Sequence, residues 1–565
     1  MKRIIATAIF AACAISAGAQ SMYDAMNYSQ NNYYGTARSM ALGNAVTAVG
    51  GDLGTVGINP AGSAVAYYGQ FTITPGFTIP SVKSTTSFGG GGEKSRTRFT
   101  MPNCAASMSF PTGNNSGLKN VTFSFAANQT NNYNMSAYSS WRNGANSKLA
   151  ELATAAYGYD EAVLADYDAF YNSDVPWDVL AAYQSGMIGS YEKGEYGGYV
   201  GNTERIAPDG SYHYVPGELA QTSSVNRYGS KTDIMANVAF NYNDKFYFGI
   251  NVGVPTIDYQ YSEFFAEAPV NIEQFPIEFN EGNTYFRSGT YDYRYLADIS
   301  GIYAKVGFIW LPTRNLRIGA AFQTPTMMTI RETGNYGCTT DYDNTRFNGD
   351  IYSPDGEYSY GLRTPYRFNA GAAFTFGQKG FISVDYEMAD YSVMKFRDIY
   401  DDDPYYSPND LFYDVNKTNR NFCGLAHQLR AGAEFKVTPA FALRAGYTIA
   451  TSPERYWKNS LGNEVTADDY LSNFADYDKN LVTLVTPAYY GDLTQSFSLG
   501  FGYSSPGSFF ADFAVRMTSY PSWDFSPYYD YYGYTSLGEY VDQKAPRINN
   551  SKNLIDAALT LGWRF

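Results

Sequence analysis

The sequence predicts an all-β fold: a 14-stranded antiparallel transmembrane β-barrel with long extracellular loops, preceded by an N-terminal segment whose resemblance to a hatch, or plug, is described below. Three observations lead to this fold class. The chain begins with an export signal, apolar and polar residues alternate in fourteen later segments, and the connections between those segments are short and long in turn. Together they indicate a protein of a Gram-negative outer membrane.

Residues 1–19 have the order of a secretory signal peptide. Two basic residues are followed by an apolar run over residues 4–15, and then by Ala17-Gly18-Ala19 before Gln20. Cys13 leaves a lipoprotein cleavage site open as an alternative. Because the apolar run continues past that cysteine, we expect cleavage before Gln20.

Composition excludes two classes of protein. After the signal there is no uninterrupted run of about eighteen apolar residues, and the mean hydropathy is −0.33, so helical membrane proteins are excluded. The net charge of −14 argues against nucleic acid as a partner. An aromatic content of 17% together with 53 glycines is typical of twisted strands and of the aromatic girdles of membrane barrels.

A membrane strand needs about ten residues that point alternately to lipid and to the lumen. The last segment shows the pattern: every odd-numbered residue from Ile555 to Phe565 is apolar, whereas Asp556 and Arg564 fall on the other face. The same test predicts strands near residues 70–79, 98–110, 118–128, 232–242, 245–261, 299–310, 315–331, 363–376, 379–391, 425–437, 441–450, 495–504, 508–518 and 554–565.

The connections provide an independent check, because bacterial barrels join short periplasmic turns to long extracellular loops. The expected short connections are 111–117, 242–244, 311–315, 377–380, 438–440 and 504–507. The expected long ones are 80–97, 129–231, 262–298, 332–362, 392–424, 451–494 and 519–553. The strict alternation places both termini of the barrel, residues 70–565, on the periplasmic side.

The longest expected loop, residues 129–231, contains helical periodicity at residues 147–171 and 177–187, which predicts a small helical cap. Aromatic and acidic clusters occur in other loops, at Asp401–Tyr406 and Tyr528–Tyr532. They indicate either capture of a glycan or amphipathic ligand or, as the favoured interpretation, an ordered and solvated outer surface.

About fifty residues, 20–69, precede the first strand and are poor in charge. They include residues 35–62, GTARSMALGNAVTAVGGDLGTVGINPAG, in which Asn59-Pro60-Ala61-Gly62 follows a Gly-Ala-rich stretch with an Asp. This pattern resembles the hatch of the FadL/TodX-type family of outer-membrane transport proteins. The resemblance implies that the segment plugs a fourteen-stranded barrel, and that the barrel takes up hydrophobic or amphipathic small molecules such as long-chain fatty acids.

The resemblance also implies a lateral exit for ligand through a gap in the third strand. The third predicted strand, Leu118–Asn128, has no Gly or Pro to bend it, so the residues themselves give no sign of such a gap. Pro102, Pro255 and Pro325 each remove a ladder hydrogen bond and predict bulges, or irregular strand ends, in other strands.

Residues that could perform chemistry are few. Only His213 and His427 are present, and we find no HExxH, CxxC or GxSxG pattern, so neither a metal site, nor a cofactor, nor an enzyme is expected. Cys104, Cys338 and Cys423 remain after cleavage of the signal. Cys338 and Cys423 are expected in adjacent extracellular loops, where a disulfide and two free thiols are both open.

The leading functional hypothesis is therefore a channel for hydrophobic or amphipathic small molecules, with outer-membrane lipid and the barrel assembly machinery as further partners. The alternatives are a barrel of a type IX-like protein secretion or surface assembly system, a haemin receptor that uses a histidine, and an outer-membrane hydrolase. Trp563 and Phe565, at the end of the last alternating segment, predict an assembly signal for barrel insertion.

Overall fold

A computed structural model describes residues 21–191, 198–207, 213–279, 281–399, 411–467, 470, 484–534 and 540–565. The expected signal peptide and the cluster at Asp401–Tyr406 lie outside the described residues. Within the described residues, no helix is long and apolar enough to cross a membrane.

The main sheet is antiparallel throughout and its long strands follow one another in chain order. Around the ring these are β1 (Gln70–Thr86), β3 (Arg98–Pro111), β4 (Leu118–Asn132) continued by β5 (Met135–Asn143), β10 (Leu219–Tyr242), β11 (Phe246–Pro269), β13 (Gly282–Trp310), β14 (Leu316–Gln323) continued by β15 (Met327–Tyr342), β17 (Gly356–Arg363) continued by β18 (Arg367–Thr375), β19 (Gly380–Asp390), β21 (Leu425–Lys436), β22 (Phe441–Thr451), β26 (Leu493–Ser504), β27 (Phe509–Ser519) and β31 (Ile548–Arg564).

Shorter elements occur before the first strand and in the connections. The helices are α2 (Met22–Ser29), α3 (Ala37–Ala41), α4 (Lys148–Ala156), α5 (Glu161–Leu164), α6 (Ala169–Asn172), α7 (Trp177–Gln184) and α8 (Tyr413–Phe422), and the 3-10 turns are η1 (Leu53–Thr55), η2 (Pro60–Val65), η3 (Ile272–Gln274), η4 (Thr345–Phe347) and η5 (Tyr391–Val393). The minor strands are β2 (Gly91–Ser95), β6 (Ile188–Ser190), β7 (Tyr199–Gly201), β8 (Arg205–Ile206), β9 (His213–Tyr214), β12 (Pro276–Phe279), β16 (Gly349–Tyr352), β20 (Lys395–Arg397), β23 (Arg455–Lys458), β24 (Glu464–Val465), β25 (Thr486–Tyr489), β28 (Trp523–Phe525), β29 (Tyr531–Tyr534) and β30 (Tyr540–Gln543).

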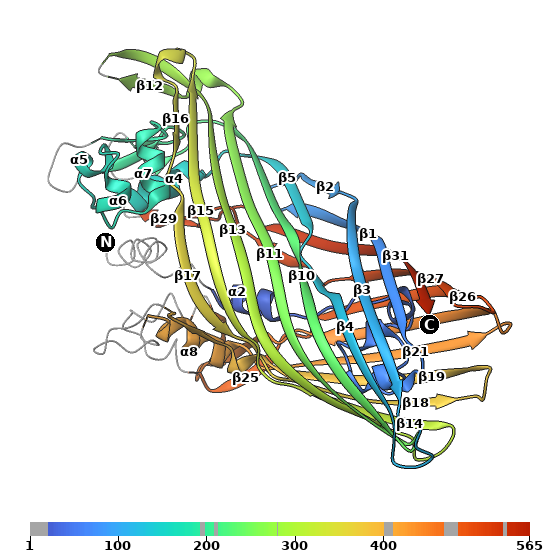
Figure 1. Cartoon of the computed structure of the whole chain (residues 1–565). Coiled ribbons are helices and arrows are strands. Elements are labelled where there is room, and N and C mark those ends of the chain that lie inside the picture. The colour runs from blue at the N-terminus through green and yellow to red at the C-terminus, as the bar shows by residue number, and fades with distance from the viewer. Residues whose placement is uncertain are drawn as a thin grey trace.

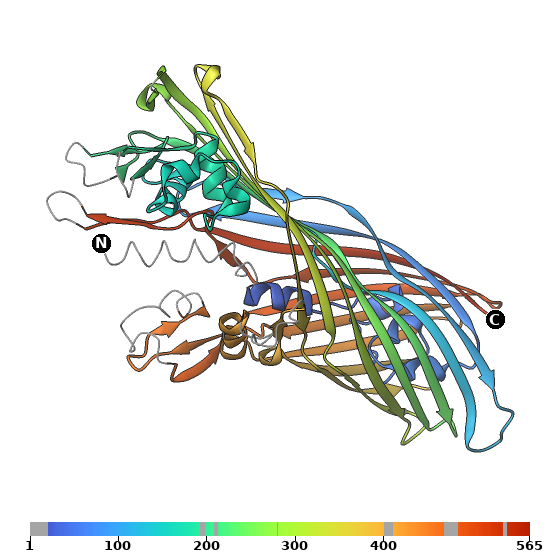
Figure 2. The ribbon, with the colours of Figure 1, turned by 60° about the vertical axis from the view of Figure 1, so that its left-hand side comes forward.

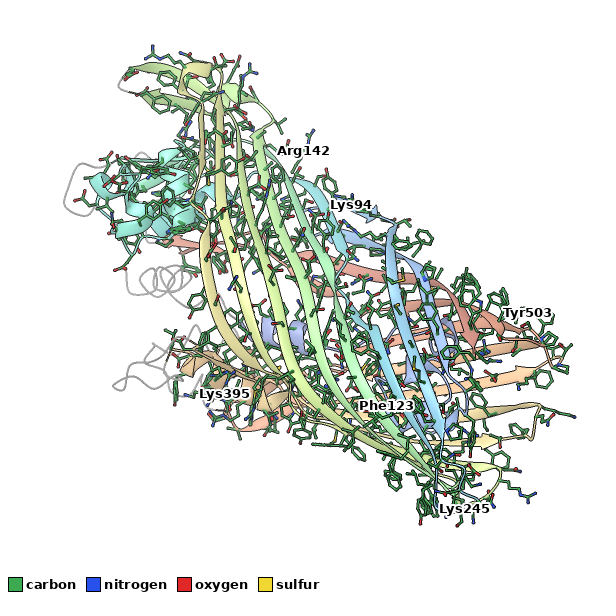
Figure 3. The ribbon with its side chains drawn as sticks, viewed as in Figure 1. Lys94, Phe123, Arg142, Lys245, Lys395 and Tyr503 are labelled. Carbon is green, nitrogen blue, oxygen red and sulfur yellow. The ribbon has the colours of Figure 1, made fainter. Side chains whose placement is uncertain are left out.

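The sheet closes on itself. β1 pairs with β31 from Gln70 opposite Arg564 to Thr86 opposite Ile548, so the first and last strands have no free edge between them. Counted as above, with interrupted strands taken as one, the ring has 14 members, and the predicted antiparallel barrel is confirmed (Figure 1). The short hairpins lie at one end, where Lys245 and Tyr503 are labelled, and the long connections lie at the other (Figure 3).

The outward face carries an apolar band whose height follows from strand register. On β10, β11 and β13, the lowest row is Tyr242, Phe246 and Trp310, and the fifth row contains Ile234 and Val254. Eight residues separate these rows on β10, which at about 3.3 Å each and a tilt of about 40° gives roughly 20 Å along the barrel axis. This is close to the apolar band of known membrane barrels, about 25 Å.

The strands do not stop at the upper edge of this band. β10, β11 and β13 continue well beyond it, so parts of the expected loops 129–231, 262–298 and 332–362 are strand, with β5 and the start of β10 inside the first of them. The alternation of apolar and polar residues does not predict these extensions, because an outward side chain above the membrane need not be apolar. The expected helical cap is present as α4 to α7, which pack together near β15 and β16 (Figure 1).

Residues 21–69, here called the inner segment, lie inside the ring. Figure 2 shows α2 and the following turns enclosed by the strands. The turn η2 contacts β10, β11 and β13, whereas α3 contacts β22, β26, β27 and β31. The inner segment therefore touches opposite sides of the wall and bridges the lumen.

Candidate functional site: the inner segment and the third strand

The inner segment is a series of short turns, each begun by a polar cap. Ser21 and Asp24 form a reciprocal capping box at the start of α2, while Thr36, Asp52 and Asn59 cap α3, η1 and η2 with their side chains. Burial raises the pKa of Asp24, and the hydrogen bonds from Ser21 only partly offset this rise. Caps of this kind satisfy backbone donors that water cannot reach inside a barrel.

Asn59 to Gly62, expected to belong to a hatch, occupy the point where the inner segment meets the wall. The Asn59 amide nitrogen donates to the carbonyls of Thr47 (2.7 Å) and Phe308 (3.1 Å), and its side-chain oxygen accepts from the Ala61 backbone (3.1 Å). Asn59 thus ties the turn both to the inner segment and to β13.

Glycines in the wall make this close approach possible. A Cβ on Gly307 would lie 2.1 Å from the Asn59 side-chain oxygen, and one on Gly249 would lie 2.3 Å from the Pro60 carbonyl carbon. Within the inner segment, Gly62 packs in the same way beside Thr55 and Gly50. The sequence analysis missed the wall glycines, although glycine at an inward position of a strand signals that another backbone comes close.

Polar side chains of the wall hold the inner segment along its length. The Arg38 guanidinium donates to Glu434 of β21 (2.9 Å), and backbone carbonyls of the segment accept from wall cations, with Lys305 donating to Gly57 (2.8 Å) and Arg516 to Tyr33 (2.8 Å). Burial acts to lower the pKa of Arg38, but the charge of Glu434 outweighs it and the pKa is raised. The lumen charges that would be unfavourable in a dry sheet core are thus compensated.

The third strand changes partner halfway along its length. β4 pairs with β3 only from Asn120 to Asn128, where Asn128 lies opposite Asn103. Above this point the inner segment takes the place of β3: the Asn32 backbone N–H donates to the Thr130 carbonyl (2.6 Å) and the Tyr34 N–H to the Gln129 carbonyl (3.1 Å). We call the boundary where β3 and β4 separate the seam.

The bend at the seam needs neither glycine nor proline in β4. Residues 128–134, here called the polar run, are all buried and include four asparagines. The Asn132 side-chain oxygen accepts from the Asn134 backbone (2.9 Å), and the Asn131 oxygen accepts from the Asn132 backbone (2.9 Å). Asparagine side chains compete in this way with ladder hydrogen bonds, so the run itself turns the strand inward.

The residues expected to disturb strands do so unequally. Pro102 lies beside an irregular register between β1 and β3, and Pro325 lies in the break between β14 and β15. Pro255 stays in register opposite Asp233 of β10, so no bulge forms there, but the pairing of β11 with β13 is interrupted at Val254 and Pro255.

Above the inner segment the inner wall is aromatic. Tyr259 contacts Tyr28 of α2 (ring centroids 5.7 Å apart) and Tyr133 of the third strand (5.1 Å), and the series continues upward through Tyr295 and Tyr293. These rings connect the long extracellular strands, the inner segment and the polar run. An aromatic surface of this kind offers apolar area with polar edges.

Two cations of this region have no carboxylate partner among the described residues. Arg227 of β10 lies over the Tyr261 ring (5.8 Å), and Lys552 of β31 lies over the Tyr520 ring (4.7 Å). Burial lowers the pKa of Lys552, and the charge of Arg227 lowers it further. By contrast, Arg516 on the adjacent wall is paired with Asp556.

An apolar patch adjoins both cations. It is formed by the buried residues Val82, Met135, Ala137 and Val225. Arg227 lies opposite Met135 in the pairing of β10 with β5, and Lys552 lies opposite Val82 in the pairing of β31 with β1. Positive charge beside buried apolar side chains is suited to an amphipathic anion.

The remaining expected residues are not brought together. His427 is exposed and hydrogen-bonded to Tyr386, whereas His213 lies in the cap near Glu204. Cys338 and Cys423 are both free and buried in separate hydrophobic clusters, so the two-thiol alternative holds.

Trp563 and Phe565 lie at the ring closure. Phe565 exchanges backbone hydrogen bonds with Gly69 (2.9 Å in each direction), and Trp563 packs between Phe71 and Phe509. Phe565 is 67% exposed on the outer surface. The position is compatible with recognition of the C-terminal end during assembly, which stays a prediction.

No family model matches the sequence, and no curated protein matches it. Among solved structures, the chain is similar to a FadL homologue of Pseudomonas aeruginosa and to the toluene transporter TodX of P. putida, each at 11% identity and a TM-score of 0.48, covering 94% of this chain and 99% of the other. It is also similar to the toluene transporter TbuX of Ralstonia pickettii, at 13% identity and a TM-score of 0.44, over 94% and 99% of the two chains.

Proposed function

We propose that this protein is an outer-membrane channel of the FadL/TodX type that takes up hydrophobic or amphipathic small molecules and releases them sideways through the seam. One observation carries the proposal: β4 leaves β3 above Asn128 and pairs with the inner segment instead. Barrels avoid free strand edges because unpaired backbone groups are costly in lipid. An interruption there, filled by a separate piece of chain, is therefore a functional feature.

Residues 20–69 act in this proposal as a hatch, with Asn59-Pro60-Ala61-Gly62 at its contact with the wall. A fourteen-stranded barrel is wide enough to conduct water unless chain fills it. The hatch closes the axial route, and the same hatch covers the free edge of β4. A small shift of Asn32 to Tyr34 would therefore open the seam while leaving the lower contacts at Asn59 in place.

Amphipathic anions such as long-chain fatty acids are the substrates that the region above the hatch favours. Arg227 and Lys552 would hold the headgroup, because within the described residues neither forms an ion pair with a carboxylate. The apolar patch and the tyrosines beside it would receive the hydrocarbon part. The two histidines do not favour a haemin receptor, and the described loops show no feature that favours a role in secretion.

A cross-link between the hatch and the third strand tests the proposal. The Asn32 side-chain nitrogen donates to the Asn131 side-chain oxygen (3.0 Å), so Asn32→Cys with Asn131→Cys, in a Cys104→Ser background, can be joined by oxidation and the link checked by mass spectrometry. Uptake of labelled oleate into cells without another transporter should fall on oxidation and return with reductant.

The matched control joins strands that remain paired. Native Cys104 of β3 lies opposite Ala127 of β4, so Ala127→Cys provides a link just below the seam. This link should leave uptake unchanged. Equal uptake in the two oxidised proteins, or no response to reductant in the first, would overturn release through the seam.

A further inference from the structure

A hollow of about 460 Å³ opens on the outer face of the barrel, over β10, β11, β13 and β15. Its polar lining comes from two horizontal rows of side chains. Asp258 lies opposite Asp298, which lies opposite Arg331, and the row beneath contains Thr256, Ser300 and Thr329. All six side chains are exposed and point away from the lumen.

The hollow lies at the edge of the hydrocarbon layer. Directly below the threonine row, Val254, Ile302 and Met327 begin the apolar band, and from there down to Phe246 and Trp310 the outward residues of β11 and β13 are apolar. The change from polar to apolar occurs within one row. A molecule in the hollow would thus have its headgroup among Asp, Arg and hydroxyl groups and its chains on the band.

The charged groups of the hollow are available to a ligand. Asp298 and Arg331 are opposite each other on neighbouring strands, yet within the described residues neither forms an ion pair or a side-chain hydrogen bond. Four residues further up β13, by contrast, Arg294 is paired with Asp292 (3.3 Å). Ion pairs thus form on this outer face, but among the described residues Asp298 and Arg331 of the hollow form none.

Elsewhere around the barrel, aromatic side chains lie on the outer face. Tyr386 and His427 stack on the outer face of β19 and β21 and share a hydrogen bond (2.7 Å), which is the usual arrangement of an aromatic girdle. At the hollow, small hydroxyl residues such as Thr256 and Ser300 stand where rings would project. Among the described residues, the lining of the hollow contains no aromatic residue, so room is left just above the apolar band.

We propose that this hollow binds the sugar headgroup of an outer-leaflet glycolipid. Two carboxylates and one guanidinium offer more acceptors than donors of charged hydrogen bonds, and carboxylates need donors such as sugar hydroxyls, which a bare phosphate lacks. Sugar hydroxyls can donate to Asp258 and Asp298 and accept from Arg331, and Thr256, Ser300 and Thr329 can do both. The acyl chains of the same lipid then cover Val254, Ile302 and Met327.

The test uses the full-length protein in detergent and purified rough lipopolysaccharide as the probe, with binding measured by native mass spectrometry. Asp298→Ala with Arg331→Ala should weaken retention of the glycolipid at least about tenfold, since both donor and acceptor groups are removed. Asp292→Ala with Arg294→Ala is the matched control, because it removes the same two charges from the same outer face above the hollow. This control should bind as the unaltered protein does.

Phosphatidylglycerol, added alone and in competition, separates a headgroup site from general attraction of lipid to the apolar band. We expect it to bind weakly and equally to all three proteins. Equal retention of lipopolysaccharide by the hollow and control variants, or displacement of it by an equal amount of phosphatidylglycerol, would overturn the proposal. The variants alter side chains of the outer face, exposed except for the half-buried Asp292, and their resistance to unfolding in detergent before heating confirms that the barrel is intact.

Discussion

The contact between β10 and β11 and the contact between β3 and β4 show two ways of building the same wall. The first runs without a break from Leu219 opposite Pro269 to Tyr242 opposite Phe246. The second ends at Asn103 opposite Asn128, where the third strand turns inward to the inner segment. In the proposed mechanism the uninterrupted contact is a barrier, and the interrupted one is the place where a small movement of the inner segment opens the wall.

Deletion of residues 24–62 should have the largest effect on this comparison. It removes both the axial plug and the substitute partner of β4, so single-channel conductance in planar bilayers should rise at least about tenfold over the unaltered protein. If correctly folded barrels with and without residues 24–62 have equal conductance, the inner segment does not plug the lumen and serves only to pack the inside of the barrel.

Arg227→Ala should have the next largest effect. A charged hydrogen bond is worth about 1.5 to 3 kcal/mol, so the concentration of fatty acid needed for half-maximal uptake should rise roughly tenfold or more. Toluene uptake should be unchanged because toluene has no headgroup. Arg142→Ala, which changes an exposed arginine of β5, serves as the control. An equal effect on both substrates would exclude a role for Arg227 in holding an anion.

Substitution within the polar run tests the origin of the bend. Asn132→Val removes an acceptor for the Asn134 backbone and introduces a residue that favours regular strand, so the third strand should extend its pairing with β3. We expect the substitution to destabilise the bent form of the third strand by about 1 kcal/mol, which should reduce fatty acid uptake about fivefold.

The control for this substitution is Asn226→Val on the regular part of β10. Hydrogen exchange of β3 residues 98–102 should slow in Asn132→Val and stay the same in Asn226→Val. Unchanged exchange and uptake in both variants would mean that the asparagines do not cause the bend.

The smallest functional effect is expected from a single wall glycine. Gly307→Ala places a carbon against Asn59 and should weaken docking of η2 by about 1 to 3 kcal/mol, while the other polar contacts still hold the inner segment. Hydrogen exchange at residues 57–62 should become faster. Gly189→Ala meets open space and is the control. If residues 57–62 exchange hydrogen equally fast in both variants, the close approach of Asn59 to Gly307 does not require glycine.

The strand count was predictable because lipid imposes alternation on one face of every strand, as in residues 555–565. The extracellular extensions of β10, β11 and β13 were not, since above the membrane that requirement ends. The bend of the third strand was missed because only Gly and Pro were considered as its cause. The asparagines at 128, 131, 132 and 134 were visible in the sequence, and they are the residues whose side chains replace ladder hydrogen bonds.

The candidate site was predictable only in part. The motif at Asn59 to Gly62 marked a special segment, but its partners come from strands nearly two hundred or more residues later. These are Gly249, Gly307 and Asn237, whose side-chain nitrogen donates to the Pro60 carbonyl (3.0 Å). Arg227 lies on β10 and Lys552 on the last strand, β31, so the two are more than three hundred residues apart in the sequence and only closure of the ring brings β31 near the early strands. No local pattern reports contacts of that kind.

A photoreactive fatty acid tests the lateral route most directly. The full-length protein is labelled by this fatty acid during uptake, and the labelled residues are mapped by mass spectrometry. Label is expected in the region of Arg227 and Tyr261, on the polar run, and on the lipid-facing residues Met101 and Phe125 beside the seam. Release through the seam predicts no label on the lumen face below the hatch, at Asn120 or Asn241. Label at Asn120 and Asn241 without label at Met101 or Phe125 would show that ligand passes along the barrel axis, and would contradict the account.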